Sequence, residues 1–283
     1  MDLKDLKVIW GKNDFRPNKR LGQNFLIDKN IRNKILSELH LNGDEFLLEV
    51  GPGFGVMTFE LAKRCREIVA VEKDALICRI MRPFFEEENI KLVTGDILEF
   101  DIKGSMPKGK TSILFGNIPY YISTPLVERI IENKKLIKSA YIVMQEEVVD
   151  RIIASPGSKT YGSLSCFVRY FTKPDKLFRI KNNSFYPSPK VSSALLKLEI
   201  LDEPSVKVRD EDLMFSIIRK AFSQRRKKAV NPLSDVSFLG IDKNIWETLF
   251  NRCDMSPSLR AEDIALSDYA RLADEVFFHR NEK

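Results

Sequence analysis

The chain has 283 residues, 43% of them hydrophobic and 30% charged, which predicts a soluble globular protein with one large domain and at most a small second one. Its formal net charge of +6 suits a polyanionic partner, while two histidines and four cysteines without paired spacing argue against a metal cluster or a histidine-dependent triad. No apolar stretch approaches the roughly 20 residues that span a bilayer, so we expect a cytoplasmic protein with reduced thiols and no membrane anchor.

The N-terminal segment is polar and precedes the first apolar pattern. Residues 1–19 mix acidic, basic and proline residues, and we expect them to form a flexible polar arm. The stretch from Gly22 to Leu26 follows, and apolar residues then recur at helical spacing with Asp28 as a plausible N-cap.

A strand, a glycine loop and a helix come next, in the order that opens a nucleotide-binding α/β sheet. The apolar strand at 46–50 runs into the loop at 51–55, whose glycines allow the backbone to approach a ligand. The next strand ends on Glu72, about 20 residues later, where an acid usually accepts hydrogen bonds from ribose hydroxyls. This pattern leaves the cofactor open between a dinucleotide and S-adenosylmethionine.

Further polar side chains follow the next strands. Asp96 comes after the strand at 90–93, where it either accepts from an adenine amine or caps a turn. Asn117 and Tyr120 follow the strand at 111–116, and Pro119 between them holds the backbone extended. The Asn117 amide oxygen, a backbone carbonyl of this loop and the Tyr120 ring can together bind an amino group attached to a heteroaromatic base. These groups meet at the carboxyl edge of a parallel sheet, which predicts a Rossmann-like α/β fold.

The pattern changes after a fifth strand at 139–144. We expect antiparallel strands at 165–171 and 176–180, and a last strand at 193–201. Between the strands at 176–180 and 193–201, two prolines stiffen the loop that begins at Phe185. A rigid loop can hold the Phe185 ring in an exposed position. The alternative is a phenylalanine buried under the loop, the commoner fate of this residue.

A linker at 202–205 leads into helical spacing. We therefore expect an N-terminal arm at 1–19, a Rossmann-like domain at 20–201 and a small helical domain at 202–283. The first helix of the last domain carries a cation cluster that suits a phosphate backbone, although a solvated helix face is the ordinary alternative. The cluster ends in Arg225, Arg226, Lys227 and Lys228.

Together these motifs resemble the small-subunit ribosomal RNA adenine dimethyltransferases (KsgA/RsmA type), over about residues 19–273. Five of the motifs are shared with the large-subunit methylases of macrolide resistance: Gly22–Leu26, Glu49–Gly53, Gly95–Asp96, Asn117–Tyr120 and Phe185–Val191. Two more are characteristic of the small-subunit branch: Phe222–Lys227 and Leu259–Glu262.

The resemblance implies S-adenosylmethionine as methyl donor and 16S rRNA within the small ribosomal subunit as substrate. It implies N6,N6-dimethylation of two adjacent adenosines near the 3′ end, a role in ribosome biogenesis, and a monomeric RNA-binding protein without a metal. Carried over by motif, the target adenine is held by Tyr120 and Phe185 and oriented by Asn117. The resemblance of the motifs also implies that the cofactor site is formed by Asn24, Leu26, Gly51, Glu72, Asp96 and Asn117.

Three other functions stay open at this point. A large-subunit rRNA adenine methyltransferase would use the same five motifs. A nicotinamide-dependent dehydrogenase would explain the glycine loop and Glu72, but would leave Asn117 and Tyr120 unused. A non-catalytic RNA-binding assembly factor would need neither Glu72 nor Asn117, and both are present.

Overall fold

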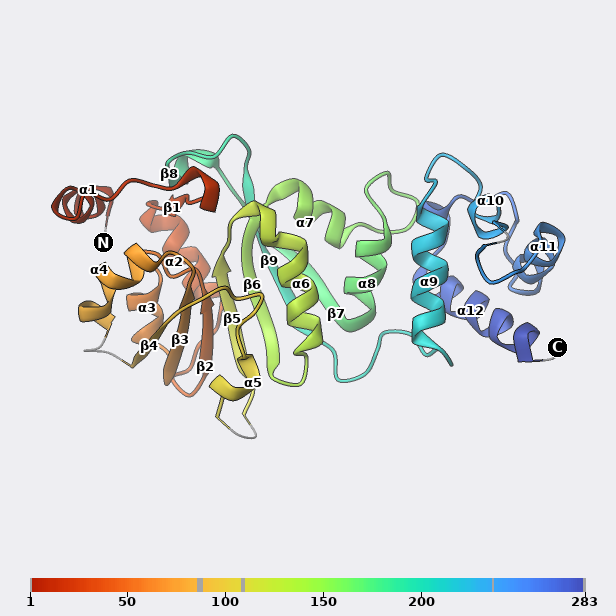
Figure 1. Cartoon of the computed structure of the whole chain (residues 1–283), viewed down its shortest axis with the longest axis horizontal. Helices are drawn as coiled ribbons and strands as arrows, with labels where there is room; N and C mark the ends of the chain where they lie inside the picture. Colours follow the sequence, from red (N-terminus) through yellow and green to blue (C-terminus); the bar gives the residue numbers. More distant parts are fainter. Residues whose placement is uncertain (1, 86–88, 108–109, 236, 282–283) are drawn as a thin grey trace. The chain divides into compact units, whose positions relative to one another are not determined.

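The computed structural model describes residues 2–85, 89–107, 110–235 and 237–281, and the chain divides into two compact units (Figure 1). Unit 1 comprises residues 1–149 and 174–200, and unit 2 comprises residues 150–173 and 201–283. The α/β class with a helical C-terminal region is confirmed. The boundaries 20–201 and 202–283 stay a prediction.

The centre of unit 1 is a seven-stranded sheet with the order β4-β3-β2-β5-β6-β9-β7. The five neighbouring strands β4, β3, β2, β5 and β6 pair in parallel, whereas β9 is antiparallel to β6. The five predicted parallel strands are therefore confirmed. The bounds are β2 Phe46–Val50, β3 Glu67–Glu72, β4 Ile90–Thr94, β5 Ser112–Asn117, β6 Ile137–Gln145, β7 Thr172–Ile180 and β9 Ser193–Ile200.

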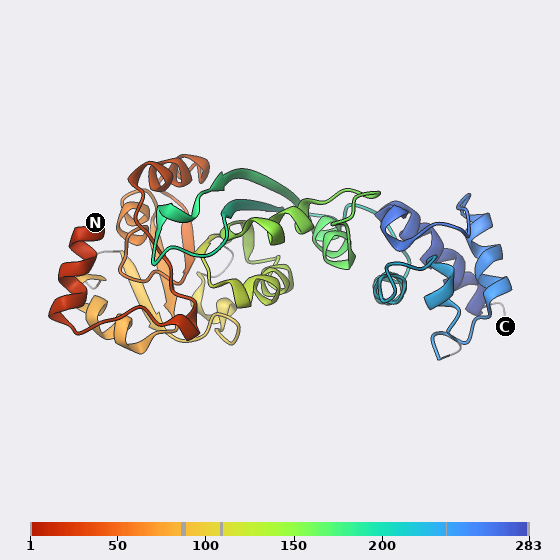
Figure 2. The same cartoon turned by 90° about the horizontal axis from the view of Figure 1, so that it is seen from above.

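The direction of the strand order reverses between β2 and β5. Because parallel crossovers are right-handed, this reversal places the connecting helices on opposite faces of the sheet, and Figure 2 shows helices on both sides of the strands. Loops that leave the carboxyl ends of β2 and β5 then diverge, which opens a crevice at this edge. The helices are α2 Lys29–Glu38, α3 Thr58–Ala62, α4 Ala75–Phe85, α5 Ile102–Ser105, α6 Ser123–Glu132 and α7 Glu146–Ile153.

The prediction of a flexible polar arm at 1–19 is wrong, because this segment contains helix α1, Leu3–Lys12. The Asp2 side chain accepts hydrogen bonds from backbone N–H groups of the first turn and caps the helix. Leu6 and Trp10, four residues apart, share one face of α1 and are buried in the core of unit 1. Ile9 of the same helix is partly buried against this core, so α1 docks on unit 1 through one apolar face.

A separate two-stranded sheet joins two motifs that are far apart in the sequence. Strand β1, Phe25–Leu26, runs antiparallel to β8, Phe185–Tyr186. Phe25 lies opposite Tyr186, and Leu26 lies opposite Phe185. Short 3-10 turns precede these strands at Lys19–Leu21 (η1) and Asn182–Ser184 (η3).

The predicted strand at 165–171 is also wrong, because the segment forms helix α8, Ser163–Phe171. Its aromatic and β-branched residues favour a strand locally, but tertiary packing decides the outcome. The rings of Phe167 and Tyr170 lie 5.5 and 5.2 Å from the ring of Phe215. Pro174 lies inside β7, which begins before the predicted strand at 176–180 and is an edge strand, where a proline is tolerated.

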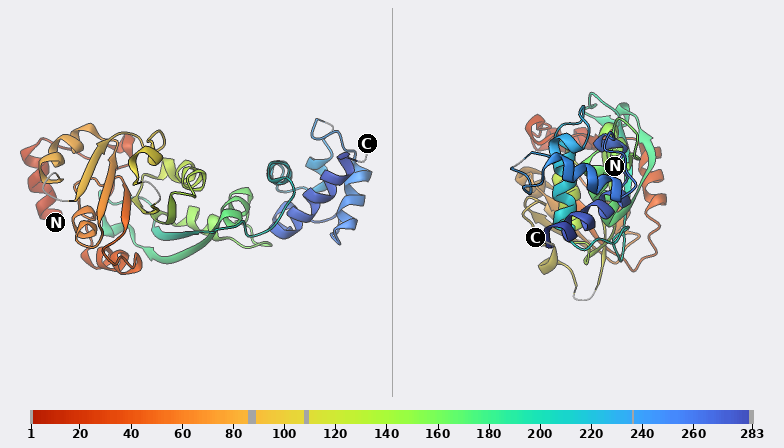
Figure 3. Two further views of the ribbon diagram at one scale, coloured as in Figure 1. Left: turned by 90° about the horizontal axis from the view of Figure 1, so that it is seen from below. Right: turned by 90° about the vertical axis from the view of Figure 1, so that its right-hand side faces the viewer.

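Unit 2 is helical, and its helices pack together (Figure 3). Within it, α9 packs against α8, α10 and α12. No helix in the described ranges is long and apolar enough to cross a membrane. The remaining bounds are α9 Glu211–Phe222, α10 Val230–Leu233, α11 Lys243–Arg252, η4 Ala261–Asp263 and α12 Leu266–Asn281.

Candidate active site

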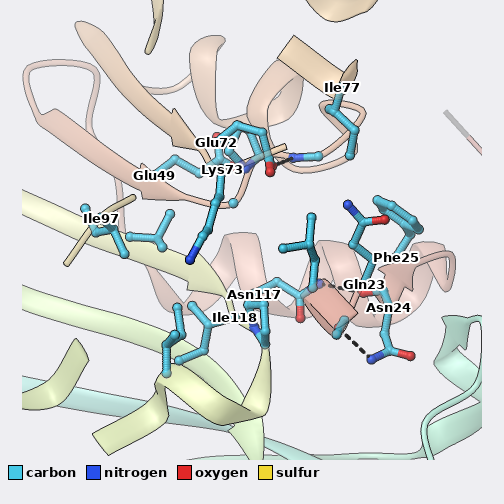
Figure 4. A pocket seen from close by; sticks show the side chains of 18 of the residues that line it. Gln23, Asn24, Phe25, Glu49, Glu72, Lys73, Ile77, Ile97, Asn117 and Ile118 are labelled. Carbon is cyan, nitrogen blue, oxygen red and sulfur yellow. Dashed lines mark hydrogen bonds between the residues drawn. The ribbon is translucent and has the colours of Figure 1, made fainter. Parts of the chain in front are cut away.

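One cavity of unit 1, at the carboxyl edge of the sheet, collects every residue that the sequence placed at the cofactor and the base (Figure 4). Its walls come from the loops after β2, β3, β4 and β5 and from β1 and β8. The predicted site residues that line it are Asn24, Leu26, Gly51, Glu72, Asp96, Asn117, Tyr120 and Phe185.

The glycine loop after β2 forms one wall of the cavity. Gly51 and Gly53 have φ angles of +69° and +55°, in the left-handed region that favours glycine. A Cβ atom at Gly53 would lie 3.1 Å from the ring of Phe25, so the absence of a side chain lets β1 press against the loop. Gly51 and Gly53 both line the cavity, and the space beside Gly53 is filled by Phe25 of β1.

Glu72 ends β3 and is tied to that loop. Its carboxylate accepts hydrogen bonds from the N–H groups of Gly53 at 3.1 Å and Asp74 at 2.8 Å. Burial raises the pKa of Glu72, and the two N–H donors oppose this rise. A carboxylate has about four acceptor sites, so two backbone donors leave acceptor capacity for the hydroxyls of a ligand.

Asp96, after β4, is held by a cation. One of its oxygens lies 2.7 Å from Lys73 Nζ, and the other accepts from Leu98 N–H at 3.0 Å. Partial burial acts to raise the pKa of Asp96, but Lys73 and Leu98 outweigh it and the pKa is lowered. Lys73 also lies 5.9 Å from the ring centroid of Tyr121, and the three residues form one side of the cavity mouth.

Asn117, the last residue of β5, has a fixed amide. Its Nδ2 donates to the backbone carbonyl of Asn24 at 3.2 Å, which orients Oδ1 away from that carbonyl. Among the described residues nothing donates to this Oδ1. The carbonyl of Pro119 accepts from Ile122 N–H at 3.2 Å, which closes the short turn η2, Tyr120–Ile122. The Asn117 oxygen and the Ile118 carbonyl remain as acceptors in this loop.

Two aromatic side chains complete the site. The Tyr120 hydroxyl lies 3.2 Å from Ser193 Oγ, so its ring is anchored to β9. Phe185 is not the exposed residue that the rigid loop predicted, because its side chain is 3% exposed and packs in the core of unit 1. It nevertheless lines the cavity, since its pairing with Leu26 draws the ring against β1.

Glu49 is a further residue of the cavity wall, and no role was predicted for it beyond its place in the motif Glu49–Gly53. It lies in β2 and lines the cavity. Its buried Oε2 and the buried Thr58 hydroxyl both lack a partner at hydrogen-bond geometry in the described part of the chain, although Thr58 is close enough to oppose the effect of burial on the pKa of Glu49. Burial raises the pKa of Glu49 to about 8. An acid inside an otherwise apolar strand was the available signal, because unpaired acids are rarely buried without a function.

The cation cluster lies in unit 2, just after α9 rather than within it. All four side chains are exposed. Arg225 donates to the carbonyls of Lys159 and Tyr161, both at 2.7 Å, so its guanidinium holds a neighbouring turn. In the described ranges Arg226, Lys227 and Lys228 form no ion pair with an acidic side chain.

Comparison with known proteins identifies the family. Residues 14–245 match the model of the ribosomal RNA adenine dimethylases. The chain is 36% identical over 272 residues to a Clostridium botulinum protein named ribosomal RNA small subunit methyltransferase A, covering 96% of this chain and 98% of the relative. It is 36% identical over 274 residues to the protein of that name from Alkaliphilus metalliredigens, covering 95% of each.

Solved structures share the fold. A dimethyladenosine transferase from Plasmodium falciparum superposes with a TM-score of 0.75 and 24% identity, covering 91% of this chain and 98% of the other. The 23S rRNA methyltransferase ErmE gives a TM-score of 0.69 at 23% identity, covering 90% of this chain and all of the other. The family match spans most of the chain and includes every residue that lines the cavity, so this protein belongs to the ribosomal RNA adenine dimethylase family.

Proposed function

We propose that this protein uses S-adenosylmethionine to dimethylate N6 of two adjacent adenosines near the 3′ end of 16S rRNA in the small ribosomal subunit, as a step of ribosome biogenesis. The observation that carries the proposal is the Asn117 amide, whose Nδ2 is bound to the Asn24 carbonyl and which lines the same cavity as Tyr120 and Phe185. The names of the bacterial relatives, ribosomal RNA small subunit methyltransferase A, favour the small subunit.

The cavity fits S-adenosylmethionine by the chemistry of its walls. Glu72 supplies acceptors for ribose hydroxyls, and Asp96 supplies one for the adenine amine. The unpartnered carboxyl oxygen of Glu49 suits the cationic amino group of the methionine part. Gly51 and Gly53, which have no side chains, line the same cavity. When bound, S-adenosylmethionine supplies a methyl group already activated on a sulfonium.

The residues of this chain then act on the nucleophile. The N6 lone pair of adenine is delocalised into the ring, so the amine attacks only after its geometry becomes pyramidal. Hydrogen bonds from N6 to Asn117 Oδ1 and to the Ile118 carbonyl favour that geometry and aim the lone pair at the methyl group. In-line displacement needs positioning more than acid–base catalysis, in keeping with a site without histidine.

Tyr120 and Phe185 hold the base, which must leave its RNA stack to enter the cavity. The hydrogen bond between Tyr120 and Ser193 fixes one ring, and the strand pairing of Phe185 fixes the other. After the first transfer N6 carries a single proton, so the second transfer proceeds with one hydrogen bond to this loop. Dimethylation therefore depends more on the two rings than monomethylation does.

Binding of the ribosomal subunit is assigned to the exposed cations of unit 2. Arg226, Lys227 and Lys228 lie together in the segment after α9 and are available to phosphates. Arg225 contributes by holding the turn at 159–161 rather than as a free charge. We propose a monomeric, cytoplasmic enzyme, as the sequence analysis expected.

Calorimetry with S-adenosylmethionine and with NAD tests the cofactor directly. We expect binding of the former alone, because an amide seat for an amino group has no use in hydride transfer. Binding of NAD alone would overturn the proposal. The large-subunit alternative is tested by incubating each purified ribosomal subunit with labelled donor, and label confined to the large subunit would favour it.

A further inference from the structure

The indole ring of Trp10 contacts three segments that build the candidate site, although Trp10 does not line the cavity itself. Its ring centroid lies 5.4 Å from that of Phe25 in β1 and 5.9 Å from that of Phe54 in the glycine loop. It lies 5.7 Å from the ring of Tyr186 in β8, with 30° between the two planes. One side chain of α1 therefore bridges β1, β8 and the loop after β2.

The β1–β8 sheet needs such support, because each strand has only two residues. An isolated two-stranded sheet is at best marginally stable, and packing against another element stabilises it. Neighbouring residues of a strand point to opposite faces, so Phe25 and Tyr186 share one face of this sheet and Leu26 and Phe185 share the other. Trp10 packs against the first pair.

The sheet matters for function because it connects two binding regions. Leu26 belongs to the proposed cofactor site, and its cross-strand partner Phe185 belongs to the proposed seat of the base. A shift of this sheet would displace both together. The contact from Trp10 to Phe54 also ties it to the glycine loop.

The docking of α1 is specific. Leu6 is completely buried on the same face of the helix, and Lys7 Nζ lies 5.3 Å from the centre of the Tyr186 ring. Phe15, which follows α1, packs edge-on against Phe54 at 4.8 Å. The family model matches from residue 14 onward, so α1 lies outside the matched residues.

We propose that Trp10 is a positioning residue of this enzyme, which holds the β1–β8 sheet against the glycine loop and thereby couples the cofactor site to the target-base site. The inference rests on the proposed function, since it needs both ligands to bind in this cavity. It assigns to α1 a role in setting donor affinity and turnover, beyond its contribution to stability.

A fluorescence experiment tests the coupling without disturbing the Trp10 contacts. The chain has two tryptophans, and Trp246 is buried in unit 2. In the Trp246→Phe variant all indole emission comes from Trp10. Titration with S-adenosylmethionine should change that emission with the same dissociation constant that calorimetry gives. The reciprocal variant Trp10→Phe, which keeps Trp246, should show no change.

The possible results separate the two proposals. Binding by calorimetry with constant Trp10 emission would overturn the role of Trp10 and leave the proposed function standing. No binding of S-adenosylmethionine to the unmodified protein would instead overturn the proposed function.

Kinetics provide a second test. At saturating donor and subunit, Trp10→Ala should lower kcat about tenfold or more, because small misplacements of reacting groups have large effects on rate. It should also weaken donor binding. Trp10→Phe, which keeps an aromatic ring, should recover most of both. Val8→Ala, at a position 56% exposed on the same helix, is the matched control and should change neither.

A merely structural role would lower the unfolding temperature of Trp10→Ala and leave kcat and donor affinity unchanged at temperatures where the variant is folded. That result would overturn the inference. If Trp10→Ala does not fold, Trp10→Leu is measured in its place under the same criteria.

Discussion

Replacing Glu49 with glutamine should abolish a proton release that accompanies cofactor binding. Burial raises the pKa of Glu49 to about 8, so at pH 7 most of the molecules carry the proton. A cationic amino group at the free Oε2 favours the ionised form and lowers this pKa. Binding at pH 7 should therefore expel up to about one proton per site from Glu49.

The sign of the pH dependence follows. Below pH 8 part of the binding energy is used to ionise Glu49, at about 1.4 kcal/mol per pH unit. The affinity ratio of the unmodified protein to Glu49→Gln should therefore rise as the pH increases from 7 through the pKa of Glu49, and it should level off above that pKa. Because the ratio cancels the titration of the ligand's own amino group, it reports on Glu49.

Calorimetry in two buffers of different ionisation enthalpy measures the proton count. The slope of the observed enthalpy against the buffer's ionisation enthalpy gives the protons released, and the difference between the two proteins isolates Glu49. Equal proton counts, or an affinity ratio that falls with rising pH, would refute the assignment of Glu49 to the amino group.

Four further outcomes are expected. Glu72→Ala should weaken S-adenosylmethionine binding about ten- to a hundredfold, since hydrogen bonds to a charged group contribute about 1.5–3 kcal/mol, and an unchanged calorimetric affinity would exclude Glu72 from the site. Neutralising Arg226, Lys227 and Lys228 together should weaken subunit binding and flatten its salt dependence, while the affinity for the donor stays constant. The control is Lys243→Gln, because the Lys243 ammonium already pairs with Glu247. An unaltered salt dependence of subunit binding would contradict the assignment. Phe185→Ala should reduce methyl transfer but leave it measurable, because one stacking face contributes about 1–3 kcal/mol per base, and the dimethylated product should fall more than the monomethylated one. Without ligand, Glu49→Gln should be increasingly more stable than the unmodified protein as pH rises from about 5 to 8, because the folded state retains a proton that the unfolded state releases; parallel melting curves would contradict this.

The parallel half of the fold could be predicted because each of its strands is an apolar run that ends at a glycine, an acid or an amide. Glu72, Asp96 and Asn117 fall at strand ends for the reason that made them candidates, since the carboxyl edge of a parallel sheet is where loops diverge. Their convergence on one cavity follows from the strand order alone.

Local sequence patterns did not predict the segments whose structure is decided by tertiary packing. The segment 165–171 has the composition of a strand, and it is helical because its rings pack against Phe215 of α9. Helix α1 was not predicted because only two of its residues, Leu6 and Trp10, are buried, and charged residues stand between them and around them. The burial of Phe185 depends on pairing with a strand far away in the sequence, which local patterns do not contain.

The central claim is that Asn117 orients the amine of a target adenine, and one measurement tests it most directly. Small ribosomal subunits are incubated with methyl-labelled S-adenosylmethionine at saturating concentration and either the unmodified protein or Asn117→Ala, and the adenosines are analysed by mass spectrometry. The unmodified protein should yield two adjacent N6,N6-dimethyladenosines near the 3′ end of 16S rRNA. Asn117→Ala should bind the subunit normally yet transfer methyl groups about 10²–10³ times more slowly, the usual effect of losing a preorganised hydrogen bond at a reacting centre. Near-normal turnover by Asn117→Ala at saturating donor would contradict the account.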